Sequence, residues 1–140
     1  MLVLLSACDW DVVEKHYATR AEASHKGTWV PEWVPAAASN IRDVHNLDTN
    51  DQTLTFSVPP SDIEPMVTGL LRLKAQDVEA AGQLANELGW NDDGPSQHKL
   101  EAYYVCPPST AAVLIVDRKS GRALYKQTVM WAFKPCGHIH

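Results

Sequence analysis

The alternation of apolar and polar residues predicts a β-hairpin in the first half of the chain. Residues 53–58 alternate strictly, which is typical of a strand with one buried face. Residues 41–47 precede them across Asp48-Thr49-Asn50-Asp51, a sequence rich in turn-forming side chains. Because the apolar residues within 41–47 are spaced by three rather than by two, we expect a bulge in this first arm.

Three further strands are expected in the second half. Residues 99–106 end at two prolines, and residues 111–116 are continuously apolar, as in a central strand covered on both faces. Residues 122–133 alternate again, after the turn Arg118-Lys119-Ser120-Gly121 in which Gly121 suits the left-handed position.

Helical spacing of apolar residues predicts two helices between these groups of strands. The first, over residues 61–71, begins with the capping box Ser61-Asp62-Ile63-Glu64. The second, over residues 76–88, is interrupted by Gly82. Together with the strands, these helices predict an α+β fold, a mostly antiparallel sheet of about five strands with a helical layer on one face.

Composition and charge argue against a nucleic-acid-binding protein and against a membrane-spanning one. The chain has 140 residues, of which 45% are hydrophobic, and this suits one globular domain. Its net charge is −5 and its basic residues are scattered, so the sequence lacks the basic patch by which a nucleic-acid-binding protein tracks phosphates. No apolar stretch reaches the ~18 residues that a membrane-spanning helix needs.

The first nine residues predict attachment to a membrane through lipid. Leu5-Ser6-Ala7-Cys8 matches the bacterial lipobox, in which the cysteine thiol is diacylated and the chain is cut just before it. A secretory signal normally has a basic start and a longer apolar stretch, so we expect a truncated signal. The alternative is a chance cysteine in an apolar N-terminus. Asp9 favours the inner membrane of the bacterial cell envelope, with the protein facing the periplasm.

The segment that follows is predicted to be polar and helical. Residues 11–17 are compatible with a helix, and Thr19-Arg20-Ala21-Glu22 is a capping box for a short helix that ends at Gly27. The alternative is an unstructured tether. The predicted organisation is a truncated lipoprotein signal (1–7), a polar helical tether (8–27), a single α+β domain (28–134) and a C-terminal tail (135–140).

Two cysteines remain if Cys8 is lipidated. Cys106 and Cys136 lie at the ends of predicted strands, and such a pair usually oxidises in the periplasm. A disulfide between them would tie the C-terminal tail to the sheet. The alternative is two buried free thiols.

Two tryptophans and two prolines form the densest motif, Gly27-Thr28-Trp29-Val30-Pro31-Glu32-Trp33-Val34-Pro35. The residue before a proline is pushed towards extended geometry, so this segment is not expected to be a helix. If it is buried, it forms a strap across the sheet with Trp29 and Trp33 in the core. If it is exposed, the two indoles and Trp90 form a binding surface.

These motifs resemble a family of small bacterial envelope proteins. Its members carry a tryptophan/proline strap, an Ile…His…Asp-Thr-Asn stretch and a later tyrosine–cysteine strand. The matching residues here are 29–35, Ile41, His45, Asp48-Thr49-Asn50, Phe56 and Tyr104-Val105-Cys106. The resemblance covers most of the chain from about residue 17 and implies an envelope location, since many members begin with lipoprotein signals. This uncharacterised family supplies no catalytic residues.

His45, Asp43 and Asp48 are the candidates for acid–base chemistry. Strand alternation places His45 and Asp43 on the same face of the sheet. The alternative is a hydrogen bond that fixes the hairpin turn. His138 and His140 near the C-terminus are too few for a structural or catalytic metal site, so we expect no metal and no cofactor.

We therefore expect a lipid-anchored envelope protein that is not an enzyme and that binds a partner protein. The partner would be an envelope protein, or a toxin or enzyme that this chain inhibits in the manner of an immunity protein. The alternative is an envelope enzyme acting on a cell-wall or small-molecule substrate around His45, Asp43 and Asp48. A third alternative is a purely structural accessory subunit.

Overall fold

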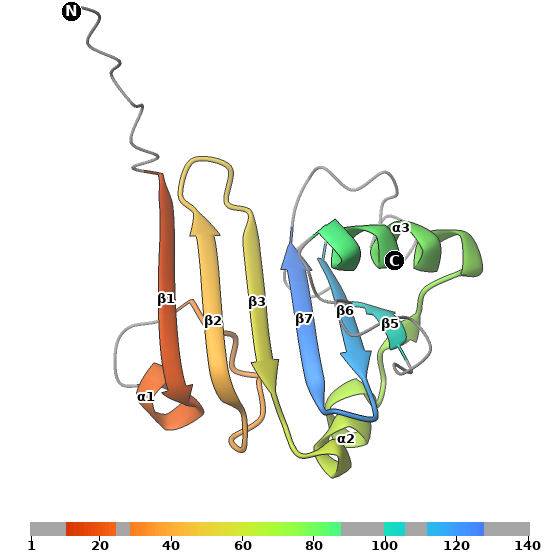
Figure 1. The fold of residues 1–140 in the computed structure, drawn as a ribbon, viewed down its shortest axis with the longest axis horizontal. Helices are drawn as coiled ribbons and strands as arrows, with labels where there is room; N and C mark the ends of the chain where they lie inside the picture. The colour runs from red at the N-terminus through yellow and green to blue at the C-terminus, as the bar shows by residue number, and fades with distance from the viewer. Residues whose placement is uncertain (1–10, 25–28, 88–99, 106–111, 128–140) are drawn as a thin grey trace, which may run out of the picture.

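The computed structural model describes residues 11–24, 29–87, 100–105 and 112–127, which form one antiparallel β-sheet with short helices around it (Figure 1). The order of the seven strands across the sheet is β1-β2-β3-β7-β6-β5-β4. The strands are β1 Val12–Thr19, β2 Ser39–Asn46, β3 Gln52–Ser57, β4 Leu71–Arg72, β5 Leu100–Tyr104, β6 Ala112–Asp117 and β7 Arg122–Gln127. The helices are α1 Arg20–Ser24, the 3-10 helix η1 Pro60–Asp62, α2 Ile63–Val67 and α3 Ala75–Glu87. None of these helices is long and apolar enough to cross a membrane.

The α+β fold predicted from the sequence is wrong, because the sheet is larger and the helical part smaller than expected. The described residues form seven strands, and the helices do not make a layer on one face. Helix α2 contributes Ile63 and Val67 to one hydrophobic core, whereas α3 contributes Ala81 to a second core. The fold is therefore β-rich, with one sheet and short helices packed on both of its faces.

Strand β1 replaces the helix predicted over residues 11–17. It pairs antiparallel with β2 from Val12 to Thr19. Its side chains alternate between the two faces, with Tyr17 buried in the core, Lys15 half-buried and His16 exposed. Because a lysine takes one of the inward positions, the period of two is hard to see in the sequence. Residues 12–19 thus belong to the sheet rather than to a helical tether.

The capping box before α1 is confirmed. The Thr19 hydroxyl oxygen accepts a hydrogen bond from the backbone N–H of Glu22 (3.2 Å), and the Glu22 carboxylate accepts one from the N–H of Ala18 (3.0 Å). The first bond satisfies a donor at the start of the helix, and the second satisfies the N–H of Ala18 in β1, one residue before the N-cap position that a complete capping box uses. Gly27, the predicted end of this helix, lies outside the described residues.

Helix α2 ends earlier than the helix predicted over residues 61–71. Thr68 leaves the helical conformation with ψ 128°, and Gly69 has φ +86°. The chain then turns into β4, which pairs with β5. The second predicted helix, over 76–88, is confirmed as α3.

The β2–β3 hairpin is confirmed, but its bulge lies at the start of the first arm, and the pairing is regular from Arg42 to His45. The pairing register shifts between Ser39 and Arg42, and Asn40 within the shift has φ +49°. Strand β6 is buried along its whole length, as predicted for a central strand, and it lies between β5 and β7.

The sheet separates two hydrophobic cores. The larger core lies on the face that also carries residues 29–38, which we call the strap. The smaller core lies under α3 and contains Leu73, Ala81, Ala102, Val113, Ile115 and Leu124. Cross-strand pairing assigns the faces, since Leu54, Tyr125 and Leu114 are opposite one another in β3, β7 and β6 and all belong to the larger core.

Gly121 joins the β6–β7 turn to the segment after β3. Its carbonyl accepts a hydrogen bond from the N–H of Val58 (2.8 Å), and its φ is +79°. A Cβ at this position would lie 1.9 Å from the carbonyl oxygen of Val58. Both the backbone conformation and the close approach therefore require glycine here.

We expect Gly121→Ala to lower the free energy of unfolding by roughly 3 kcal/mol or more, because strain and a backbone clash add. Gly69→Ala is the matched control, since Gly69 also has positive φ (+86°) but a Cβ there would have no atom within 4 Å. It should cost only about 1 kcal/mol. Urea denaturation of both variants measures the difference, and equal losses would show that the contact with Val58 is unimportant.

Candidate functional site

The strap folds as two tight turns on the face of the sheet. The N–H of Val34 donates to the carbonyl of Pro31 (3.1 Å), and the N–H of Ala38 donates to the carbonyl of Pro35 (3.0 Å). The segment is therefore not uniformly extended, although the Val-Pro steps favour extended geometry. The turns direct Val34 and Ala38 into the core, where both are buried.

The two tryptophans of the strap have different environments. Trp33 packs at a tilt against Phe56 and Tyr125, with ring centroids 6.2 and 5.3 Å apart, and is only partly buried. Trp29 stacks on His45 at 4.6 Å and remains 41% exposed. Each indole thus anchors the strap on one side and presents surface on the other. Trp90, the third tryptophan of the predicted binding surface, lies outside the described residues.

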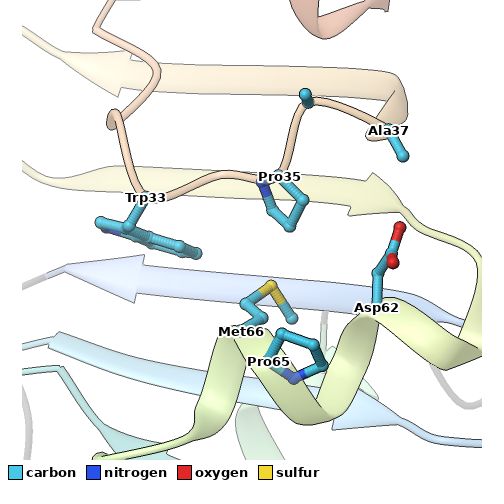
Figure 2. Close-up of a pocket in the computed structure, with 7 residues that line it drawn as sticks. Trp33, Pro35, Ala37, Asp62, Pro65 and Met66 are labelled. Atoms are coloured by element: carbon cyan, nitrogen blue, oxygen red, sulfur yellow. The ribbon is translucent and has the colours of Figure 1, made fainter.

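A groove runs between the strap and helix α2 (Figure 2). Its volume is about 420 Å³. Figure 2 shows Trp33 and Pro35 on the strap side and Pro65 and Met66 on the helix side. The full lining is Trp33, Pro35, Ala36, Ala37, Asp62, Pro65 and Met66. Among the side chains that line the groove, Asp62 alone is charged, through its carboxylate, and the others are apolar or aromatic.

Asp62 supplies that carboxylate at one end of the groove. In Figure 2 its side chain rises from the start of α2 towards Ala37. Within the part of the chain that the structure describes, this carboxylate makes no ion pair and no side-chain hydrogen bond. A carboxylate beside an apolar surface favours a ligand with a cationic group next to an apolar one.

Asp43 and His45 lie together beneath Trp29. Both face the strap from β2, as strand alternation predicts, and both are buried. Gln52 donates from its amide nitrogen to Asp43 Oδ1 (3.0 Å) and to the carbonyl of Trp29 (3.1 Å). His45 Nε2 lies 3.0 Å from the side-chain oxygen of Asn50. These contacts fix the hairpin turn and join it to the strap.

Asp48 is not part of this cluster. It is exposed in the β2–β3 turn, where its backbone N–H donates to the side-chain oxygen of Asn46 (2.9 Å). The structure therefore brings together two of the three residues expected to carry acid–base chemistry. Gln52 and Asn50 complete the cluster. Asn50 belongs to the Asp-Thr-Asn stretch that carries the family resemblance, whereas no pattern in the sequence singles out Gln52.

Burial is the largest influence on the pKa of the Asp43 carboxyl. Desolvation raises the pKa of this carboxyl above its ordinary value of 3.8, and the hydrogen bond from Gln52 and the nearby charges of His45 and Lys15 oppose the rise. Asp43 Oδ2 and His45 Nδ1 are buried and lack hydrogen-bond partners among the described residues. Since neither residue lines the groove and Trp29 covers the imidazole, this geometry supports a structural role for the pair.

A network of charged side chains lies at the other end of the same face. Arg118 contacts the carboxylates of Glu101 (2.6 Å) and Glu64 (2.7 Å), and Arg72 contacts Glu101 from β4 (2.9 Å). The Tyr103 hydroxyl donates to Glu101 (2.7 Å). Desolvation is the largest single effect on Glu101, but the bonds from Arg118 and Tyr103 and the charges of the two arginines outweigh it together and lower its pKa. This network joins β4, β5, the β6–β7 turn and α2.

Several predicted residues lie outside the described part of the chain. They are Cys8, Cys106, Cys136, Trp90, His138 and His140. Lipidation of Cys8 and the Cys106–Cys136 disulfide thus stay predictions. Among the residues that are described, no group of three or more His, Cys, Asp or Glu is placed to hold a metal ion.

Comparison with known families relates one segment to a known domain. The family model for the YbbD head domain matches residues 11–57, about a third of the chain, and links this segment to a small bacterial family. The match begins one residue before β1 and ends with β3, so it includes the strap and the Asp43–His45 cluster. Searches of curated proteins and of solved structures found no match.

The raised pKa of Asp43 has a consequence for stability. The folded state holds a proton at this carboxyl more tightly than the unfolded chain does. The contribution of Asp43 to stability is therefore most favourable below its unfolded pKa and declines as the pH rises through the folded value.

We expect Asp43→Asn to raise the free energy of unfolding near neutral pH, because the amide keeps an acceptor for Gln52 and removes a buried charge. The difference from wild type should shrink as the pH falls through the raised pKa of the folded carboxyl towards its ordinary value of 3.8, because the wild-type carboxyl then takes up its proton. Asp48→Asn in the exposed turn is the control and should change stability by less than about 0.5 kcal/mol. A destabilised Asp43→Asn at neutral pH would contradict the assignment of burial as the main effect.

Proposed function

We propose that this chain is a lipid-anchored protein of the bacterial envelope that binds a partner protein and does not catalyse a reaction. The lipobox Leu5-Ser6-Ala7-Cys8 supports the anchor, and Asp9 favours an inner-membrane protein that faces the periplasm. The match of residues 11–57 to a domain of a small bacterial family is compatible with this location.

The main support for a binding role is the groove between the strap and α2. It offers an apolar wall formed by Trp33, Pro35 and Met66 and one carboxylate, Asp62. Grooves lined by aromatic side chains can dock extended, polyproline-like peptide segments, whose conformation is set before binding. We infer that the occupant is an extended segment of a partner protein that carries a Lys or Arg for Asp62 and an apolar residue for Trp33.

The burial of the candidate acid–base residues also favours binding over catalysis. A general acid or base must reach the proton that it transfers. Asp43 is 1% exposed and His45 is 7% exposed, and Trp29 stacks on the imidazole. An inhibitor that resembles an immunity protein is one form of this role, since the net charge of −5 suits a basic partner.

The groove can be tested with a displayed library of random peptides selected on the immobilised full chain. We expect enrichment of peptides that combine a basic and an apolar residue. Asp62→Lys should weaken their binding by about tenfold or more, since it replaces attraction with repulsion. Asp48→Lys, the same change in an exposed turn away from the groove, should bind them as wild type does.

Two results would contradict this docking site. One is a selection that yields no sequence preference, and the other is equal binding of the selected peptides to Asp62→Lys and to wild type. Amide NMR shifts confined to the strap and α2 on peptide addition provide a second measure of the location, and shifts confined to the far face of the sheet would exclude the groove.

The lipid anchor has a separate test. When the native gene is expressed in a bacterial host, the wild-type protein should incorporate labelled palmitate and sediment with membranes, because acylated Cys8 inserts into the bilayer. Cys8→Ser should do neither, whereas Cys106→Ser should behave as wild type. A Cys8→Ser protein that stays with membranes in high salt would show that the lipobox interpretation is wrong.

A further inference from the structure

A second hollow lies on the sheet face opposite the strap. Its volume is about 250 Å³, and its lining is Asn40, Thr55, Phe56, Ser57 and Arg122. Phe56 is buried in the larger core, so the flanking residues of β3, Thr55 and Ser57, face the other way by strand alternation. This hollow is separate from the groove, so a ligand bound here is independent of the function proposed for the groove.

Three strands bring the lining residues together. Ser57 of β3 is paired with Arg122 of β7 on one side and with Ser39 of β2 on the other. The bulge after Ser39 adds Asn40 to the lining, with φ +49°. A left-handed asparagine is uncommon in a strand, and bulges often re-aim a side chain next to a functional site.

The lining is rich in groups that can donate hydrogen bonds. Among the described residues, the side chains of Asn40, Thr55 and Ser57 make no hydrogen bond. Arg122 adds a guanidinium group. Arg42 is paired with Thr55 across the strands, so it lies on the same face, where it contacts Glu14 (2.6 Å). The hollow therefore combines an amide, two hydroxyls and a cation on an otherwise acidic protein.

We propose that this hollow is a binding site for the phosphate group of a small molecule or of a lipid headgroup. A guanidinium group binds phosphate through two parallel hydrogen bonds. The remaining oxygens of a tetrahedral phosphate can accept further hydrogen bonds, and the donors on β2 and β3 line the same hollow. A planar carboxylate would use fewer of these donors, and an uncharged ligand would not use the charge of Arg122.

The test is an NMR titration of the isotope-labelled full chain with inorganic phosphate at constant ionic strength. We expect saturable amide shifts at Asn40, Thr55, Ser57 and Arg122. Arg122→Gln should weaken binding by about tenfold or more, because it removes a charge-assisted hydrogen bond. Lys119→Gln removes the same charge from an exposed turn residue outside the hollow and should leave binding within about twofold of wild type.

Asn40→Gly gives a second variant that keeps the fold. Glycine adopts positive φ without strain, so the bulge should persist while the amide is lost. We expect weaker phosphate binding and an unchanged or higher melting temperature. Because this variant leaves all charges in place, its effect separates a shaped site from a general attraction of phosphate to Arg122.

Two further ligands distinguish the sources of the phosphate. Glycerol 3-phosphate tests a soluble phosphomonoester, and phosphatidylglycerol vesicles, compared with phosphatidylcholine vesicles in co-sedimentation, test a headgroup. Binding of either one that is lost in Arg122→Gln supports the site and identifies its ligand. Shifts that do not saturate, or that are the same in wild type and Arg122→Gln, overturn it.

Discussion

The side-chain amide of Gln52 donates one hydrogen bond to Asp43 and another to the backbone carbonyl of Trp29, and the position of the strap depends on this pair of bonds. One bond lies within the hairpin, and the other reaches a residue far earlier in the chain. With Trp29 held in this place, its ring can stack on His45, and the turns that follow can bury Val34. The wall of the groove therefore depends on a buried polar contact at the opposite end of the strap.

The side chains of strand β3 alternate between the two faces of the sheet, so this strand contributes residues to both candidate sites. Phe56 packs against Trp33 and so supports the groove, while Thr55 and Ser57 line the hollow on the other side. A change in the register of β3 by one residue would exchange these two sets of side chains. The six-residue pairing of β3 with β7 and the contact between Val58 and Gly121 oppose such a shift.

The sequence predicts the elements whose side chains follow a clear period. The alternation of 53–58, the apolar run of β6 and the position of Gly121 each identify their local structure correctly. Strand β1 is not predicted because a half-buried lysine interrupts the apolar residues on its inward face. Strand β4 is not predicted because it has two residues, both exposed, and these show no periodicity. The shared face of Asp43 and His45 is predictable from spacing. Their cover by Trp29 is not, because it depends on a partner from a distant segment.

Strand β1 forms one edge of the sheet, and its outer backbone groups have no neighbouring strand among the described residues. Such an edge is a template for sheet extension from one molecule to the next. Lys15 counters this tendency, because it points inward from the edge strand and its ammonium group lies 5.0 Å from the centre of the Trp29 ring. An added strand would remove more water from that charge without supplying an anion. The lysine that interrupts the period of β1 in the sequence is thus also the kind of inward-pointing charge that makes an edge strand a poor template for a second molecule.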